Sequence, residues 1–377
     1  MPSRPLRGLP GRFRGNVAEP RCSGLLLLLL LGACTGAGAG AGDGASEQPA
    51  VPARENAASI EAAPAAAGSL PPPGPSQSDP AAAPADRPGR RVAITFDDLP
   101  FTAGPAEHRC DAEAIRRLNH ELLAEVAAHR VPAFGFVNEG RICEQLQGDF
   151  LAEMLTLWLD AGHGLGNHTF DHPDFNVTPL ADYAASLERG AVLTRRLLAA
   201  RGRDLVYFRP PYLRTGDTPE KKAAFDRLLA EQGYRLGPVT FDNDEWVFAA
   251  AYARAIAAGD EAARRKIGEA YAPWLETTIE HLERRSVAVL GEEPPQVLLL
   301  HANWLNANWF GSVAAMLAER GYRFVPLEEA LAHPAYSRPD PYVGRRGISW
   351  LHRWGLAEGL PVEMEPAAPE WVYDAME

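Results

Sequence analysis

Reactive polar side chains stand at the ends of five apolar runs in this chain. Each run has the length of a buried strand, four of the five contain β-branched or aromatic residues, and helical patterns separate the runs. The residues at these ends are Asp97, His168, Arg209, Asp242 and His301. The carboxyl ends of parallel strands lie on one face of an α/β sheet or barrel, where active sites collect. The pattern therefore predicts an α/β fold with these five side chains on one rim.

The alternation of strands and helices predicts a parallel sheet with helices outside. Seven strands are expected, at 92–96, 133–137, 164–169, 205–208, 234–241, 296–300 and 322–325. Helices are expected at 111–129, 150–159, 180–198, 219–229 and 312–317. We further expect a helical insertion at about 247–287 and an irregular tail, 334–377, packed on a barrel of residues 91–333.

The first 90 residues have a different composition. Residues 1–33 combine five arginines with a run of seven leucines, which is typical of a secretory signal and too short for a membrane span of about 20 residues. The run ends in Leu31-Gly32-Ala33-Cys34, which resembles the bacterial lipobox with an acylated cysteine; ordinary cleavage after Cys34 is the alternative. We expect a lipoprotein signal at 1–33, lipidation of Cys34 and a disordered Ala/Gly/Pro-rich tether at 34–90.

Charge and cysteine content limit the partners and the location. The net charge is −12, or −16 without residues 1–33. Such an acidic protein is not expected to bind nucleic acid or anionic lipid surfaces. The predicted lipid on Cys34 is then the expected contact with a membrane. Thr35, rather than Asp, follows Cys34, so we expect an exported protein on the outer membrane, facing the periplasm. Cys110 and Cys143 are then either a disulfide or two free buried thiols. The oligomeric state is left open.

Two pairs of residues predict a metal site. Asp97 and Asp98 point to opposite faces of a regular strand, so they meet only where the strand ends and turns, as Pro100 indicates. One carboxylate can then bind metal while the other acts as a base. His168 and His172 are four residues apart and can reach the same ion. Two imidazoles and one carboxylate leave a position for water, as in catalytic zinc sites.

The remaining strand ends carry groups that orient or transfer protons. Two prolines separate Arg209 from Tyr212, so the Tyr212 N–H is presented from a stiff loop, as an oxyanion hole requires. Arg209 can orient a carboxylate through two hydrogen bonds. Asp242 is expected to pair with His301 and to favour its protonated form. Structural roles at a barrel rim remain the alternative for each residue.

In this order, the segments resemble those of the polysaccharide deacetylases, carbohydrate esterase family 4. The resemblance rests on Thr95-Phe96-Asp97-Asp98, His168-Thr169-Phe170-Asp171-His172, Arg209-Pro210-Pro211-Tyr212, Asp242 with Trp246, and Leu299-Leu300-His301. It extends from about Arg91 to Pro326 and implies a distorted (β/α)7 barrel. It also implies a divalent metal, usually Zn²⁺, as cofactor.

The resemblance assigns a role to each reactive residue. The metal ligands would be Asp98, His168 and His172, and Asp97 would be the base. The other implied roles are Arg209 steadying Asp97, His301 as the acid tuned by Asp242, and the Tyr212 N–H stabilising the oxyanion. The expected function is metal-dependent removal of acetyl groups from an N- or O-acetylated glycan or oligosaccharide. The alternatives are a C–N hydrolase for a small non-sugar amide and an inactive, membrane-tethered glycan-binding module.

Several positions depart from the family pattern. Leu99 and Leu213 stand where the family usually has Gly, and Glu245 stands where Asp is common. We expect both leucines, with Trp246 and Leu299, to line the substrate pocket. The added bulk would narrow the cleft and favour a chain end or a short oligomer. Core packing is the default alternative for Trp246 and Leu299.

Overall fold

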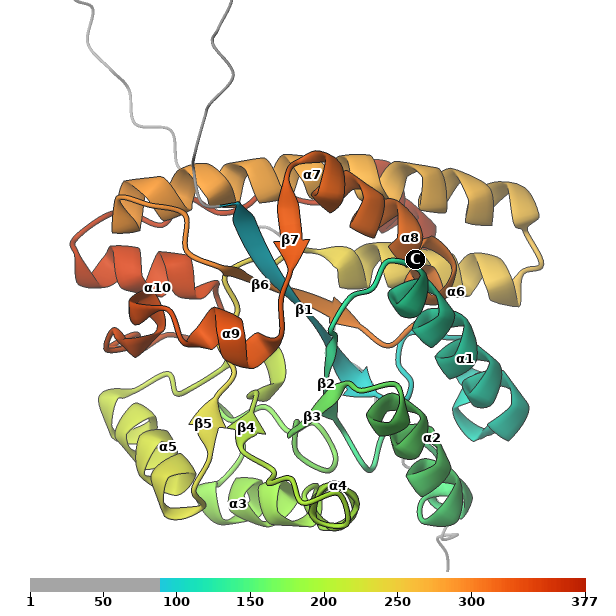
Figure 1. Ribbon diagram of the computed structural model, residues 1–377, viewed down its shortest axis with the longest axis horizontal. Coiled ribbons are helices and arrows are strands. Elements are labelled where there is room, and N and C mark those ends of the chain that lie inside the picture. Colours follow the sequence, from blue (N-terminus) through green and yellow to red (C-terminus); the bar gives the residue numbers. More distant parts are fainter. Residues whose placement is uncertain (1–88) are drawn as a thin grey trace, which may run out of the picture. The chain divides into compact units, whose positions relative to one another are not determined.

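Seven parallel strands form the centre of the computed structural model, which describes residues 89–377 (Figure 1). They are β1 (Arg90–Leu99), β2 (Phe134–Val137), β3 (Gly164–Asn167), β4 (Tyr207–Phe208), β5 (Arg235–Leu236), β6 (Gln296–His301) and β7 (Tyr322–Phe324). The strand order is β5-β4-β3-β2-β1-β6, and β7 pairs with the start of β1. The predicted signal, Cys34 and the tether up to residue 88 lie outside the described residues.

Backbone hydrogen bonds close the sheet into a distorted barrel. On one side, Gly237 N–H donates to the carbonyl oxygen of Phe208 in β4, at 2.8 Å. On the other side, Thr240 N–H donates to Val297 O at 3.1 Å, and Phe241 pairs with Leu298 of β6. The segment 235–241 thus joins the two ends of the strand order. The predicted α/β class with a seven-stranded barrel is confirmed.

Helices surround the strands (Figure 1). They are α1 (Ala112–Ala128), α2 (Asp149–Asp160), α3 (Leu180–Arg189), α4 (Val192–Ala199), α5 (Pro219–Glu231), α6 (Glu245–Ala257), α7 (Glu261–Leu290), α8 (Trp304–Glu319), α9 (Leu327–Leu331), α10 (Trp350–Ala357) and α11 (Glu370–Met376). Short 3-10 turns are η1 (Ala106–Cys110), η2 (Glu144–Leu146), η3 (Pro211–Leu213) and η4 (Pro334–Ser337). Within the described residues, no helix is both long and apolar enough to cross a membrane.

Two predicted segments differ in detail from the structure. The insertion expected at 247–287 is a helix pair, α6 and α7, which are separated by a short turn. The tail contains the helices α10 and α11 and is thus more regular than expected. Ser349 caps the start of α10, and its hydroxyl accepts a hydrogen bond from Leu351 N–H. In the tail, α10 packs on α7 and α11 packs on α6.

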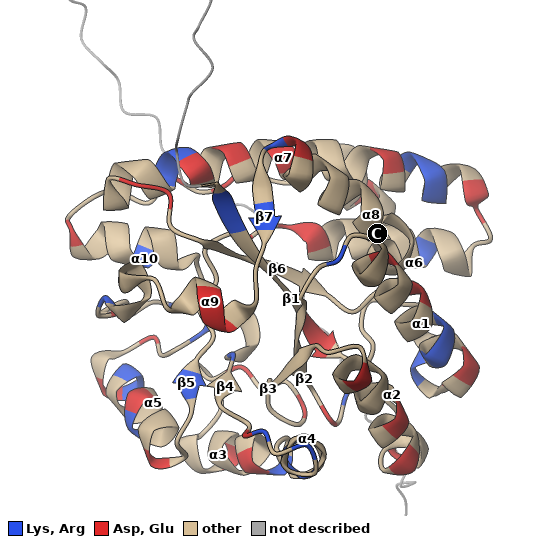
Figure 2. Ribbon diagram, viewed as in Figure 1, with Lys and Arg blue, Asp and Glu red and all other residues tan. Residues whose placement is uncertain are grey.

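Side chains of β1 alternate between two cores. Phe96 faces outward and packs edge-on against Trp158 of α2 and Phe310 of α8, with ring centroids 5.7 and 5.5 Å away. The opposite face points into the barrel, where Ala93 belongs to a buried cluster with residues of β2, β4 and β6. Asp97 has the same parity as Ala93, so it ends the inner face of β1. Figure 2 shows β1 basic at its start and acidic at its carboxyl end.

A helix break supports the turn that carries the two histidines. The helix predicted at 180–198 is divided into α3 and α4 at Gly190. A Cβ atom on Gly190 would lie 2.4 Å from the carbonyl carbon of Thr169, so only glycine permits this approach. Phe170 N–H also donates to Ser186 O at 3.0 Å. The break therefore lets the helix pair lie directly against the turn of residues 168–172.

Candidate metal centre

Asp97 and Asp98 converge because β1 is distorted at its carboxyl end. The pairing of β1 with β2 shifts register between Phe96 and Leu99, and Asp98 adopts a left-handed backbone with φ of 61°. Asp97 Oδ2 and Asp98 Oδ1 consequently lie 3.8 and 3.7 Å from the same atom, Nε2 of His168. The convergence was predicted from a turn at Pro100, but the distortion already begins at Asp98.

His168 is held in one orientation at the end of β3. Its Nδ1 lies 2.7 Å from the carbonyl oxygen of Arg209. A carbonyl only accepts hydrogen bonds, so Nδ1 carries the proton and Nε2 presents its lone pair to the site. His172 lies at the end of the following turn, with φ of 57°. Its ring packs against the rings of His168 and Tyr212, at centroid distances of 5.0 and 4.5 Å.

Three side chains can hold one metal ion. Nε2 of His168 and Nε2 of His172 lie 3.7 and 3.6 Å from Asp98 Oδ1, and the three ligand atoms lie within 4.8 Å of one another. Tetrahedral ligands about 2.0–2.1 Å from Zn²⁺ would be about 3.3 Å apart, so the two distances from Asp98 to the histidines need only a small contraction. Asp98 Oδ1 is buried and has no hydrogen-bond partner among the described residues, which a metal would provide.

The electrostatics of Asp98 and His172 suit a metal as well. Burial alone would raise the pKa of Asp98, but Arg141 and nearby histidines hold it well below its usual range. Burial lowers the pKa of His172 to about 3 against the opposing charge of Asp98. Asp98 is therefore an ionised carboxylate and His172 a neutral imidazole, the forms that bind metal.

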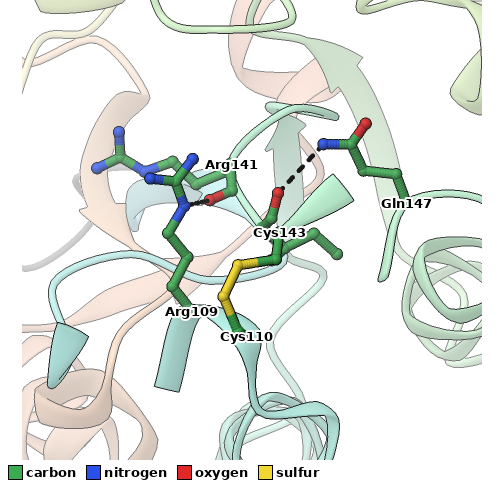
Figure 3. Close-up of a disulfide and its surroundings, with 6 residues drawn as sticks. Arg109, Cys110, Arg141, Cys143 and Gln147 are labelled. Carbon is green, nitrogen blue, oxygen red and sulfur yellow. Dashed lines mark hydrogen bonds between the residues drawn. A yellow bond between two sulfur atoms is a disulfide. The ribbon is translucent and has the colours of Figure 1, made fainter. Parts of the chain in front are cut away.

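A disulfide holds the loop that supplies Arg141. Arg141 Nη2 lies 3.4 Å from Asp98 Oδ2, the carboxylate oxygen that faces away from the histidines. Cys110 and Cys143 form a disulfide, so the structure contains the first of the two states left open by the sequence (Figure 3). Next to it, Arg109 Nε donates to the carbonyl oxygen of Arg141 at 2.9 Å. Sequence reasoning missed Arg141, whose only signal is its position two residues before Cys143.

Asp97 is paired with Arg209, as the sequence predicted. Arg209 is fully buried, and its Nη1 donates to Asp97 Oδ1 and to Thr95 Oγ1, each at 2.7 Å. Its Nε donates to Gly237 O at 3.0 Å, and its guanidinium carbon lies 4.1 Å from the centre of the Phe136 ring. These contacts fix the carboxylate, with Oδ2 directed toward His168 and the metal site.

His301 is paired with Glu245, which the sequence analysis did not select. His301 Nδ1 lies 2.7 Å from Glu245 Oε2, and Glu245 Oε1 accepts hydrogen bonds from the side-chain amides of Asn303 and Asn306. Burial lowers the pKa of His301, but the charge and hydrogen bond of Glu245, with smaller contributions from the two aspartates, outweigh it and raise that pKa to about 9. His301 is therefore protonated at neutral pH.

The predicted pairing of Asp242 with His301 is wrong. Asp242 ends the segment after β5, and its Oδ1 accepts from Asn243 N–H. Burial and the nearby Glu365 raise the pKa of Asp242 to about 8, whereas no contact joins it to His301 among the described residues. Glu245, three residues later, is the first residue of α6, and this position carries its carboxylate to His301. Its place directly before Trp246 was the available signal.

The structure also corrects the predicted pocket. Leu99 is fully buried and packs against Gly135 of β2, so it does not line the rim. Leu213 is 5% exposed and is covered by the tail at Gly347. Leu299, 8% exposed, shares a strand face with His301, two residues away.

Two aromatic residues predicted at the site remain accessible. Trp246 is 42% exposed in the first turn of α6, and Tyr212 is 46% exposed beside His172. Tyr212 therefore offers apolar surface beside the metal site, which the two leucines do not, and a pocket role for Trp246 stays a prediction.

Comparison with known proteins finds similarity in the segment that carries the metal ligands. Residues 85–230, less than half of the chain, match the family model for polysaccharide deacetylase. A chitin deacetylase from Colletotrichum lindemuthianum is 30% identical over 122 residues, which cover 32% of this chain and 42% of that protein. The chain thus matches less than half of the length of this relative.

Two solved structures illustrate the range of proteins that resemble this chain. A family 4 carbohydrate esterase from Streptomyces lividans, in complex with acetate, is 20% identical, with a TM-score of 0.39 over 64% of this chain and 96% of that one. A CE4-family pseudoenzyme from Bacillus anthracis is 16% identical, with a TM-score of 0.40 over 65% and 66%.

Proposed function

We propose that this protein is a metal-dependent hydrolase that removes acetyl groups from an N- or O-acetylated carbohydrate. One observation carries the proposal: the ligand atoms of Asp98, His168 and His172 lie within 4.8 Å of one another, beside the carboxylate of Asp97. His301 lies opposite Asp97, in register on the adjacent strand β6. The match of residues 85–230 to the polysaccharide deacetylase model and the chitin deacetylase relative support this substrate class.

Each residue has one task in the proposed reaction. A bound divalent ion, with Zn²⁺ suited to two histidines and one carboxylate, would supply Lewis acidity and lower the pKa of a water molecule. Asp97 accepts the proton of the attacking water while Arg209 holds its carboxylate. His301, protonated at neutral pH, donates a proton to the leaving amine or alcohol. The Tyr212 N–H is the proposed donor to the developing oxyanion.

Acetate release from a defined substrate panel tests the proposal. The panel contains N-acetylglucosamine oligomers of increasing length, peptidoglycan, acetylated xylan and a small non-sugar N-acetyl amide, each with and without a chelator. Chelator-sensitive release from a carbohydrate supports the proposal. Release from the small amide alone favours the C–N hydrolase, and glycan binding without any release favours the binding module. Binding and acetate release are also measured for Asp97→Asn, which lacks the proposed base and keeps all three metal ligands. An enzyme should lose acetate release in this variant, whereas a binding module should bind its glycan as before.

The proposed location is the bacterial cell envelope, with a lipid on Cys34. The disulfide between Cys110 and Cys143 supports an oxidising compartment outside the cytosol. Metabolic labelling with a fatty acid, in the wild type and in Cys34→Ser, tests the anchor. Incorporation of the fatty acid into Cys34→Ser, or no incorporation into the wild type, would contradict a lipid anchor on Cys34.

A further inference from the structure

The C-terminal segment of residues 340–354, here called the clasp, connects three loops of the active-site rim. The family match ends at residue 230, so the clasp lies outside it. Asn176, four residues beyond His172, donates from its side-chain amide to the carbonyl oxygens of Gly344 and Arg345, at 3.3 and 3.1 Å. Trp350 N–H donates to Val239 O at 2.8 Å, in the segment that leads to α6. The clasp thereby bridges the loops after β3 and β5.

Between these two loops, the clasp holds the loop of Tyr212 through one buried arginine. Arg353 is fully buried in α10. Its Nη2 donates to the carbonyl oxygen of Leu213, and its Nη1 donates to Thr215 Oγ1 at 3.1 Å. The same Nη1 pairs with Asp340 Oδ2 at 2.9 Å. The planar guanidinium thus joins the two ends of the clasp to the Tyr212 loop, a geometry that lysine does not reproduce.

The loop has a backbone that needs such support. Tyr212 and Leu213 are consecutive residues with φ of 56° and 53°, in the left-handed region that residues with a Cβ atom avoid. Gly347 of the clasp lies directly over this turn, since a Cβ atom on it would be 1.8 Å from Tyr212 O. Tertiary contacts must therefore hold the turn. Those on its outer side come from the clasp.

We propose that the clasp is part of the active site, with Arg353 as the positioning residue that holds the Tyr212 N–H in its reactive place. This inference rests on the proposed function for its catalytic consequence. Arg353 itself does not contact the metal ligands. Its loss should displace the oxyanion donor, whereas the metal ligands themselves lie on β1 and on the loop after β3. Because this second loop contacts Tyr212 and Arg209, zinc affinity is measured together with activity.

The test compares Arg353→Lys with Arg338→Gln in the full-length protein. Arg338 lies in the same tail but pairs with Glu358 on the surface, so its substitution controls for the general effect of replacing an arginine of the tail. Thr215→Val is a second variant that removes one Arg353 contact with little change in volume, in case Arg353→Lys does not fold. Three quantities are measured: hydrogen exchange of a peptide spanning 209–216, kcat and KM for acetate release, and zinc affinity.

In Arg353→Lys, we expect faster exchange in 209–216 and a fall in kcat of about 10²-fold, as for a misplacement of about 1 Å. Thr215→Val should show the same changes to a smaller extent. KM and zinc affinity should stay within about threefold of the wild type in both variants, because a lost oxyanion contact acts on the transition state. Arg338→Gln should behave as the wild type in all three measurements.

Two results overturn the inference. One is unchanged hydrogen exchange of residues 209–216 in both Arg353→Lys and Thr215→Val. The other is a loss of activity that is fully accounted for by weaker zinc binding. If the zinc-loaded wild type releases no acetate from any substrate, the proposed function fails. The exchange data then still decide whether Arg353 holds the loop.

Discussion

Replacing Glu245 with Gln should leave His301 mostly unprotonated at pH 8, where the wild-type imidazole is mostly protonated. The substitution keeps the shape of the side chain and removes its charge. Glu245 is 1% exposed, and its Oε2 lies 2.7 Å from His301 Nδ1, so little solvent screens the pair. Without the carboxylate charge, the burial that lowers the pKa of His301 is no longer outweighed.

The magnitude follows from the two pKa values. In the folded protein, the pKa of His301 is raised from 6.5 to about 9, which is about 2.5 units or about 3.4 kcal/mol in favour of the protonated form. Loss of that contribution returns the pKa to about 6.5 or below. At pH 8, the protonated fraction would then fall from about 90% to about 3%, so the rate should fall about 30-fold. The difference between the two enzymes should shrink as the pH falls toward the pKa of His301 in the variant.

The assay is the pH dependence of kcat/KM for acetate release between pH 5 and 10. Because His301 must be protonated to act as the acid, activity falls as pH rises through its pKa. The pH at which kcat/KM falls on the basic side (the basic limb) should be lower by about 2 pH units or more in Glu245→Gln. Both enzymes carry the same metal, so any effect of the metal on this fall is the same in both.

Asp242→Asn is the matched control, since it removes a carboxylate three residues away that does not contact His301. Its basic limb should stay near that of the wild type. A limb that moves in Asp242→Asn and not in Glu245→Gln would refute the assignment of Glu245 as the partner of His301.

Further predictions concern the base, the metal and the disulfide. Asp97→Asn should lower kcat about 10²–10⁴-fold with zinc affinity retained, measured by calorimetry; weakened zinc binding would instead make Asp97 a ligand. Arg141→Leu should weaken zinc about 10–100-fold in competition with a chromogenic chelator, because Arg141 orients Asp98; equal affinity would show that Asp98 is held without it. The double substitution Cys110→Ser with Cys143→Ser should lower the free energy of unfolding by about 2–4 kcal/mol. It is measured by urea denaturation, and an unchanged midpoint concentration of urea would contradict this.

The sequence predicts the fold well because local signals and topology agree. Apolar runs ending in polar residues mark strands that are buried on both faces, and the helices between them permit only parallel connections. The exceptions lie where tertiary contacts override local preference. The helix at 180–198 breaks at Gly190 because the turn of Thr169 occupies the space of a Cβ atom, and this neighbour is far away in the sequence.

The candidate site is predictable where spacing decides it. Asp98, His168 and His172 were selected from short segments at strand ends, and the structure brings them together. The partner of His301 was not predictable in the same way, because it depends on how far the chain turns between the end of β5 and the start of α6. Arg141 was missed for a similar reason: its contact with Asp98 depends on a loop shaped by the disulfide.

Two buried ion pairs define the direction of the proposed reaction. The two pairs are Arg209–Asp97 and Glu245–His301. Burying such a pair costs the hydration of its charges, so its net contribution to stability is small. Their retention is better explained by the chemistry at the rim. Asp97 of β1 is directly paired in register with His301 of β6, so the base and the acid arise from neighbouring positions on adjacent strands. A bond that is cleaved by both must therefore lie above this one pair, with the attacking water on the β1 side and the leaving group on the β6 side.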